Sequence, residues 1–158
     1  MMSAENAKNT IELLERADVT IDEVGISTGS LIDPRTFVYL KIKNFGRSVA
    51  TAVTTRGKLL LSDGPTGQVV KPTELPIEED APPIVLPAAG GRSLVISKPF
   101  GEWIDQETIT RINSSDIQLL LEIAITYRDV FGREHLTCFE GTFNATIASF
   151  SYRAFEAH

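Results

Sequence analysis

Apolar and polar side chains alternate along most of this chain. The longest alternating run covers residues 117–127 and places apolar side chains at every second position: Ile117, Leu119, Leu121, Ile123, Ile125 and Tyr127. Shorter runs of the same period cover residues 19–26, 36–43, 92–98 and 134–146. A period of two is typical of β-strands, in which successive side chains point to opposite faces. The pattern therefore predicts strands in all five segments.

Three further segments have a weaker strand pattern, namely the Thr-rich 49–62, the short 84–86 and the aromatic tail 147–158. One short connecting helix is predicted over residues 106–112, because Asp105 can cap its first turn. Helices and strands do not alternate regularly, so no parallel sheet is predicted. We expect an all-β chain, an immunoglobulin-like antiparallel β-sandwich of about seven to eight strands.

The alternation slips in two strands, and a β-bulge is the expected cause. Val24 is out of phase with Ile21, which predicts a bulge near Glu23, and Gly57 suggests a second bulge in the third strand. Residues 44–48 form a compact turn between strands, where Asn and Gly are expected because both tolerate positive φ.

The chain begins with a predicted helix over residues 3–17, in which Ser3 is the expected cap. Ala4, Ala7, Ile11 and Leu14 form an apolar stripe of two heptads. Two interpretations are open: a helix docked on one end of the sandwich, which we favour, or the stub of a longer coiled coil. The predicted organisation is thus a helix over 1–17 and a sandwich over 18–158.

A proline-rich loop is predicted over residues 63–91, which hold six of the eight prolines. Proline cannot donate a hydrogen bond to a β-ladder, so most of this stretch is expected to be irregular or to lie at a sheet edge. Residues 84–86 are expected to attach it to the body as a short edge strand.

Charge and composition exclude several classes of function. The 158 residues carry 15 Lys and Arg against 21 Asp and Glu, a net charge of −6, which argues against a nucleic-acid partner. One cysteine excludes an internal disulfide framework. The longest apolar runs are only a few residues, so we expect a soluble chain that does not itself insert into a membrane.

Residues that carry chemistry are sparse. Cys138 and His135 lie three positions apart on one predicted strand, so they face opposite sides and cannot form a nucleophile–base pair. His158 is the only other histidine. The acidic run 78–80 lacks the ligand spacing and glycine of a calcium loop. We therefore expect no metal, no cofactor and no enzymatic activity.

Five residues are candidates for an interaction surface: Phe37, Tyr39, Trp103, Asp129 and Arg133. Phe37 and Tyr39 share a strand face with two lysines, which predicts partial exposure. Trp103 is interpreted as a plug at the end of the sandwich, with an interface anchor as the alternative. Asp129 is expected to cap the amides of its own loop and to pair with Arg133, with a charged recognition tip as the alternative. His135 is expected to bond to loop carbonyls or to Asp129.

Two segments resemble known bacterial proteins. Residues 43–50 read Lys-Asn-Phe-Gly-Arg-Ser-Val-Ala and resemble the K-N-x-G-x-x-x-A pattern of bacterial immunoglobulin-like domains. Residues 127–139 are similar to the Y-x-D-x-F-G-x-x-H-x-T-x-F hairpin of small uncharacterised membrane-anchored proteins, in which membrane helices and a helical segment lead into a β-sandwich. The junction 11–21 looks like that transition, although no membrane helix precedes it here. The resemblance implies a sandwich displayed near a membrane, membrane-associated in a full-length protein.

The expected function is that of a non-enzymatic protein-interaction domain. Its partner would bind an edge strand, the proline-rich loop 63–91, or the face of Phe37 and Tyr39. The alternative is an assembly module that forms homo-oligomers through its N-terminal helix. A third hypothesis, a carboxylate-based hydrolase, requires two inward-facing acids near Trp103.

Overall fold

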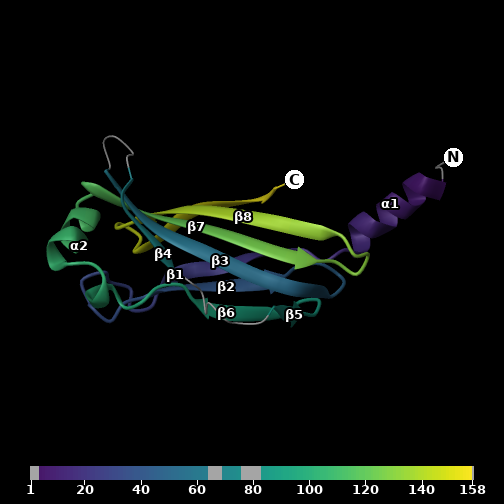
Figure 1. Cartoon of the computed structure of the whole chain (residues 1–158), viewed down its shortest axis with the longest axis horizontal. Helices are drawn as coiled ribbons and strands as arrows, with labels where there is room; N and C mark the ends of the chain where they lie inside the picture. The colour runs from purple at the N-terminus through teal and green to yellow at the C-terminus, as the bar shows by residue number, and fades with distance from the viewer. Residues whose placement is uncertain (1–3, 64–68, 76–82, 158) are drawn as a thin grey trace.

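The computed structural model describes residues 4–63, 69–75 and 83–157 (Figure 1). Within these ranges it contains nine strands, two α-helices and one 3-10 helix. In chain order these are α1 Ala4–Glu15, β1 Val19–Ile26, β2 Val38–Asn44, β3 Ala50–Asp63, β4 Val69–Leu75, β5 Ile84–Leu86, β6 Gly91–Val95, η1 Phe100–Glu102, α2 Gln106–Asn113, β7 Ile117–Arg128, β8 Glu134–Asn144 and β9 Ser149–Ala157. The expectation of an all-β sandwich with two helices is confirmed, with nine strands in place of seven or eight.

Two antiparallel sheets lie face to face. The smaller sheet has the order β1-β2-β6, and the larger has the order β4-β3-β7-β8-β9, with β5 paired to the start of β3. Strands that are distant in the chain are therefore neighbours: β6 lies beside β2, and β7 lies between β3 and β8. Long β3 and β7 form the centre of the larger sheet (Figure 1).

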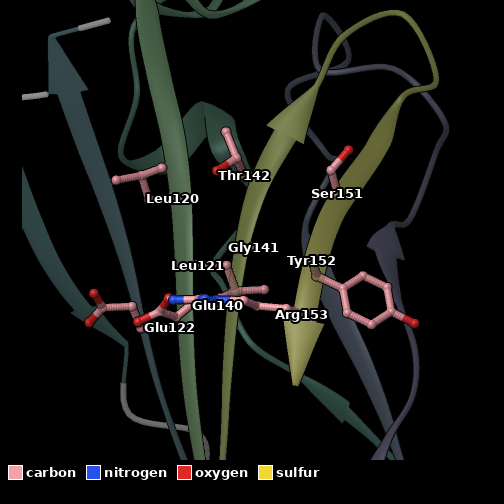
Figure 2. A pocket seen from close by; sticks show the side chains of 9 residues that line it. All are labelled: Leu120, Leu121, Glu122, Glu140, Gly141, Thr142, Ser151, Tyr152 and Arg153. Carbon is pink, nitrogen blue, oxygen red and sulfur yellow. The ribbon is translucent and has the colours of Figure 1, made fainter. Parts of the chain in front are cut away.

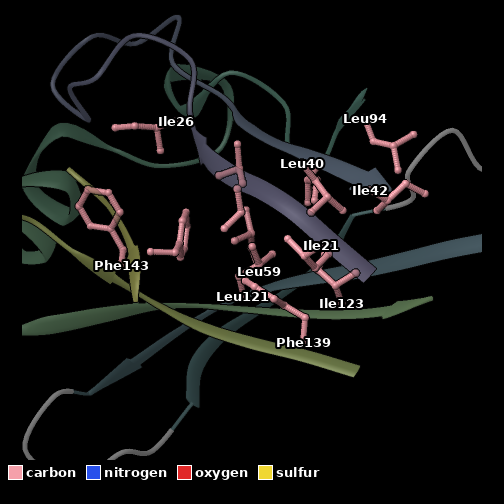
Figure 3. Packing of buried hydrophobic residues seen from close by; sticks show 14 of the residues in the cluster. Ile21, Ile26, Leu40, Ile42, Leu59, Leu94, Leu121, Ile123, Phe139 and Phe143 are labelled. Carbon is pink, nitrogen blue, oxygen red and sulfur yellow. The ribbon is translucent and has the colours of Figure 1, made fainter. Parts of the chain in front are cut away.

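The core lies between the two sheets and is built by alternate side chains of each strand. In β7 the alternation is regular, with buried side chains at every odd position from Ile117 to Tyr127. Leu40 and Ile42 of β2 face Leu59, Leu121 and their neighbours across the interior (Figure 3). Burial of apolar area on this scale is the main favourable term in folding, at about 25 cal/mol per Å².

The described part of the proline-rich segment contains a strand that we did not predict. Residues 69–75 form β4, which pairs with β3 from Gly57↔Leu75 to Ser62↔Val69. Pro72 is accommodated because β4 lies at the edge of its sheet, where its missing N–H disturbs no second ladder. The short strand expected at 84–86 is present as β5. The acidic run 78–80 lies outside the described residues.

The bulges are found partly where the sequence predicts them. In β1 the register with β2 shifts between Ile21 and Glu23, so the first prediction is confirmed. Gly57 is regularly paired, and the second prediction is wrong. β3 is irregular at Ala52, which has a φ of 50° between the register shifts to β5 and β7. Its register with β4 also shifts, between Leu61 and Ser62.

The N-terminal helix does not dock on the sandwich as we had favoured. Figure 1 shows α1 extending away from the end of the sheets, and the side chain of Leu14 is 59% exposed. The expected cap, Ser3, lies outside the described residues. No helix in the described part of the chain has the length and apolar character needed to cross a membrane.

Candidate interaction surface

The five predicted surface residues do not form one surface. Phe37 and Tyr39 lie on the outer side of the smaller sheet and are half-buried. Trp103 follows η1, beside α2, at the end of the sandwich opposite α1 (Figure 1). Asp129 and Arg133 belong to the β7–β8 loop, at the end from which α1 extends. The structure therefore separates these residues into three places.

Tyr39 is held in a small polar network. Its hydroxyl donates a hydrogen bond of 2.7 Å to Glu23, whose other carboxylate oxygen lies 3.1 Å from Lys41 Nζ. The bond from Tyr39 and then the ammonium of Lys41 hold the pKa of Glu23 below its ordinary value. The same bond, together with partial burial, raises the pKa of Tyr39. This face is thus occupied by its own cross-strand contacts, although Tyr39 stays partly accessible.

Trp103 packs where it was expected, at the end of the core. Its ring lies edge-on to Phe100, with 5.6 Å between ring centroids, and Phe100 is fully buried. Ile104 is buried beside it. The helix α2 that follows begins as predicted, because the Asp105 carboxylate accepts a hydrogen bond of 2.8 Å from the Thr108 amide.

At the α1 end, a buried asparagine joins three segments. Asn44 Oδ1 accepts hydrogen bonds from the amides of Asp18, at 3.0 Å, and Gly46, at 2.9 Å. Its Nδ2 donates to the carbonyls of Ser48, at 2.8 Å, and Leu86, at 3.1 Å. All four hydrogen-bonding positions of the side-chain amide are therefore used. Asn44 fixes the β2–β3 turn against both the α1–β1 junction and β5.

Gly46 is required by close contact, not by positive φ as we predicted. Its φ is outside the left-handed region, but a Cβ at this position would lie 2.3 Å from the Arg16 carbonyl oxygen and 2.6 Å from the Asp18 nitrogen. The turn is pressed against the chain between α1 and β1. The Ser48 hydroxyl adds a hydrogen bond to the Glu15 carbonyl at the end of α1.

The β7–β8 loop is also held by hydrogen bonds to one buried side chain, that of Asp129. As predicted, Asp129 caps its own loop, accepting from the amides of Phe131, at 2.9 Å, and Arg133, at 3.0 Å. Its second oxygen lies 2.6 Å from His135 Nε2, and the His135 ring stacks on Tyr127. Gly132 supplies the left-handed residue, with a φ of 80°.

Burial and hydrogen bonding act on Asp129 in opposite directions. Burial raises the pKa of the Asp129 carboxyl, but the hydrogen bonds from His135, Arg133 and Phe131 outweigh it. The net result is a pKa below the ordinary value, so the carboxylate is charged and acts as an acceptor for all three groups.

These rigid turns present apolar side chains to solvent. We call Phe45, Val49, Val130 and Phe131 the apolar tips: the first two belong to the β2–β3 turn and the others to the β7–β8 loop. Val130 is 52% exposed and Phe131 39%. The two turns are adjacent, since Thr51 at the start of β3 pairs with Arg128 at the end of β7. Exposed apolar groups on a rigid frame are typical of an interaction site.

A separate shallow hollow of about 560 Å³ crosses the outer side of the larger sheet. Its floor is the backbone of Leu121, Gly141 and Tyr152, which are paired across β7, β8 and β9. Figure 2 shows two rows of side chains beside it: Leu120, Thr142 and Ser151 on one side, and Glu122, Glu140 and Arg153 on the other.

The acidic side of this hollow is balanced within the sheet. Arg153 lies 3.0 Å from Glu140 and Lys58 stands opposite Glu122 in the register. No group of three or more His, Cys, Asp or Glu side chains that could hold a metal ion is found among the described residues.

The expected chemistry of the remaining polar residues is partly confirmed. His135 pairs with inward-facing Tyr127 while Cys138 pairs with outward-facing Ala124, so the two lie on opposite faces as predicted. Cys138 is partly buried. Asp129 is the only buried carboxylate in the part of the chain that the structure describes, and it lies far from Trp103. The two inward-facing acids that a hydrolase would need there are not found among those residues.

Comparison with known proteins gives no family. No family model matches the chain, and no curated protein matches it. One similar solved structure is the crystal structure of a protein from Archaeoglobus fulgidus, with 14% sequence identity and a TM-score of 0.35, over 91% of this chain and 98% of that one. This likeness is too weak to support an argument about function.

The sequence alone did not indicate the apolar tips. The local pattern predicts Phe45 only as part of a turn, and Val130 and Phe131 only as part of a hairpin loop. One available signal was the position of large apolar side chains in predicted turns, where burial is rare and exposure is the default.

Proposed function

We propose that this chain is an immunoglobulin-like, non-enzymatic interaction domain that binds a protein partner at its α1 end. The strand orders β1-β2-β6 and β4-β3-β7-β8 correspond to the orders A-B-E and C′-C-F-G of an immunoglobulin domain of the variable type. In this correspondence the β2–β3 turn is the B–C loop and the β7–β8 loop is the F–G loop. Variable domains use the same two loops for binding.

The observation that carries the proposal is the exposure of four apolar side chains on turns that have little freedom to move. The buried side chains of Asn44 and Asp129 hold the two turns through hydrogen bonds. A preorganised surface loses little conformational entropy on binding, and central apolar anchors supply most of the affinity of typical interfaces.

Site-specific photocrosslinking in the native host tests this proposal. A benzophenone amino acid at Phe131 is expected to give one dominant adduct. The same group at Ile147, which is 59% exposed and precedes β9, is the matched control and should give no such adduct. The same adducts from both positions, or none from Phe131, would contradict a partner at the α1 end.

An assembly module remains the second candidate, because α1 extends into solvent with Leu14 exposed. In this case α1 would pair with α1 of other copies. Light scattering of the double variant Ile11→Ala, Leu14→Ala decides it: an oligomer that becomes monomeric favours assembly through α1, and an unchanged mass argues against it.

A further inference from the structure

Among the edge strands that the structure describes, β9 stands out because it lacks the features that prevent strand pairing. An exposed edge presents unpaired N–H and C=O groups and is normally blocked by a bulge, a proline or a short strand. In this chain β1 has a bulge between Ile21 and Glu23, β4 contains Pro72, and β6 has five residues. The fourth, β5, has only three residues, so every other described edge strand is blunted.

The β9 strand has none of these devices. It is nine residues long, contains neither proline nor glycine, and pairs with β8 in an unbroken register from Leu136↔Ala157 to Asn144↔Ser149. Tyr152 and Phe155 are 49% and 42% exposed. Its one basic residue, Arg153, is bound to Glu140 at 3.0 Å and does not serve as a free edge charge.

We propose that β9 pairs with β9 of a second copy of this chain, antiparallel about a two-fold axis at Ala154, so that the two larger sheets become one continuous sheet. Two-fold dimers are the commonest homo-oligomers, and their interface must be self-complementary. Pairing about Ala154 places Arg153 of each copy opposite Phe155 of the other copy.

The contacts within one chain support this register. Arg153 already lies over the Phe155 ring, 5.5 Å from its centroid, so the same pair of groups is favourable at short range. Ala154 is small and exposed, which suits the axis of the dimer. Pairing about Arg153 instead would place two guanidinium groups directly opposite each other, and like charges in that position are destabilising.

The arrangement has a consequence for α1. β9 runs towards the end of the sandwich that carries α1, and the two β9 strands would be antiparallel (Figure 1). The two α1 helices therefore lie at opposite ends of the dimer and cannot pair within it. Pairing through β9 leaves the apolar tips of both copies open to a partner.

Light scattering of the full chain tests the dimer. The wild type is expected to have twice the 17.3 kDa chain mass, and Phe155→Lys should reduce this to the mass of one chain. Val85→Lys is the matched control, because Val85 is 60% exposed on β5, away from β9. The variant Ile11→Ala, Leu14→Ala should stay dimeric. A wild-type chain that is monomeric up to millimolar concentration would overturn the proposal.

Disulfide formation tests which residues of the two β9 strands lie opposite each other. The readout is a gain of a covalent dimer, so a variant that merely unfolds does not imitate it. In a Cys138→Ser background, Ala154→Cys places two thiols directly opposite each other, within reach of a disulfide. We expect a covalent dimer on mild oxidation of this variant, and none for Arg153→Cys or Ser151→Cys. A dimer that forms only at position 153, or equally at all three positions, would contradict pairing about Ala154.

Discussion

His135 Nε2 lies 2.6 Å from Asp129 Oδ2, and both side chains are almost fully buried at the base of the β7–β8 loop. Because the carboxylate only accepts hydrogen bonds, the ring nitrogen is the donor. This contact closes a network in which Asp129 also binds two loop amides. The loop that presents Val130 and Phe131 is thus held from below by one carboxylate.

The first prediction concerns the pH dependence of stability. The pKa of Asp129 is lower in the folded chain than in the unfolded chain, so its contribution is present above the unfolded value, about 3.9, and is lost as the pH falls through the folded value. Asp129→Asn should therefore lower the free energy of unfolding at neutral pH by about 1–3 kcal/mol. It should also reduce the loss of stability in acid. Urea unfolding over a pH series measures both effects.

The control for this prediction is Glu102→Gln, which removes an exposed carboxylate at the other end of the sandwich. It should leave the acid dependence close to that of the wild type. If Asp129→Asn showed the same acid dependence as the wild type, the depressed pKa of Asp129 would not be a source of stability.

The second prediction concerns Asn44. In Asn44→Ala the amides of Asp18 and Gly46 lose their acceptor in a partly buried site, and the Leu86 carbonyl loses its donor in a buried one. Each unsatisfied buried group costs about 1–3 kcal/mol, so the variant should lose at least about 2 kcal/mol of unfolding free energy. Asn113→Ala, at the exposed end of α2, is the matched control and should change it by less than about 0.5 kcal/mol. If the two variants unfolded at the same denaturant concentration, the hydrogen bonds of Asn44 would not contribute to stability as we propose.

The third prediction concerns why glycine is needed at two positions: positive φ at Gly132 and close backbone contact at Gly46. Gly132→Ala meets no neighbouring atom and only has to hold a φ of 80°, which costs about 1–2 kcal/mol. Gly46→Ala has no such conformational problem, but its Cβ would lie 2.3 Å from the Arg16 carbonyl. Backbone must move there, so we expect a larger loss of stability than at Gly132. Thermal unfolding of the two variants gives the comparison, and a milder effect at Gly46 would contradict it.

Much of the fold follows from local sequence pattern. The alternation over 117–127 reports a strand buried on one face, and that information is contained in the segment itself. The Asp105 cap and the Gly132 turn are also local, since each depends on residues within four positions. These features were therefore predictable from the sequence.

The parts that the sequence did not predict depend on contacts between distant segments. Gly46 was expected to serve the local turn, but it is needed because residues 16–18 pass against it. The β4 strand forms around Pro72 because β3 offers it an edge. The bulge at Ala52 lies where β3 meets both β5 and β7. In each case the cause is a neighbour that no local pattern reveals.

The last prediction tests whether the apolar tips serve binding or folding. Val130 and Phe131 are 52% and 39% exposed, so Val130→Ser with Phe131→Ser should lower the unfolding free energy by less than a single truncation in the core does. Phe139→Ala is the contrast, since Phe139 is 1% exposed in the core and its truncation should cost about 3–5 kcal/mol. A large loss of stability in the double serine variant would mean that these side chains support the fold. Unchanged stability together with loss of the adduct from a crosslinker at Phe45 would tie them to a partner.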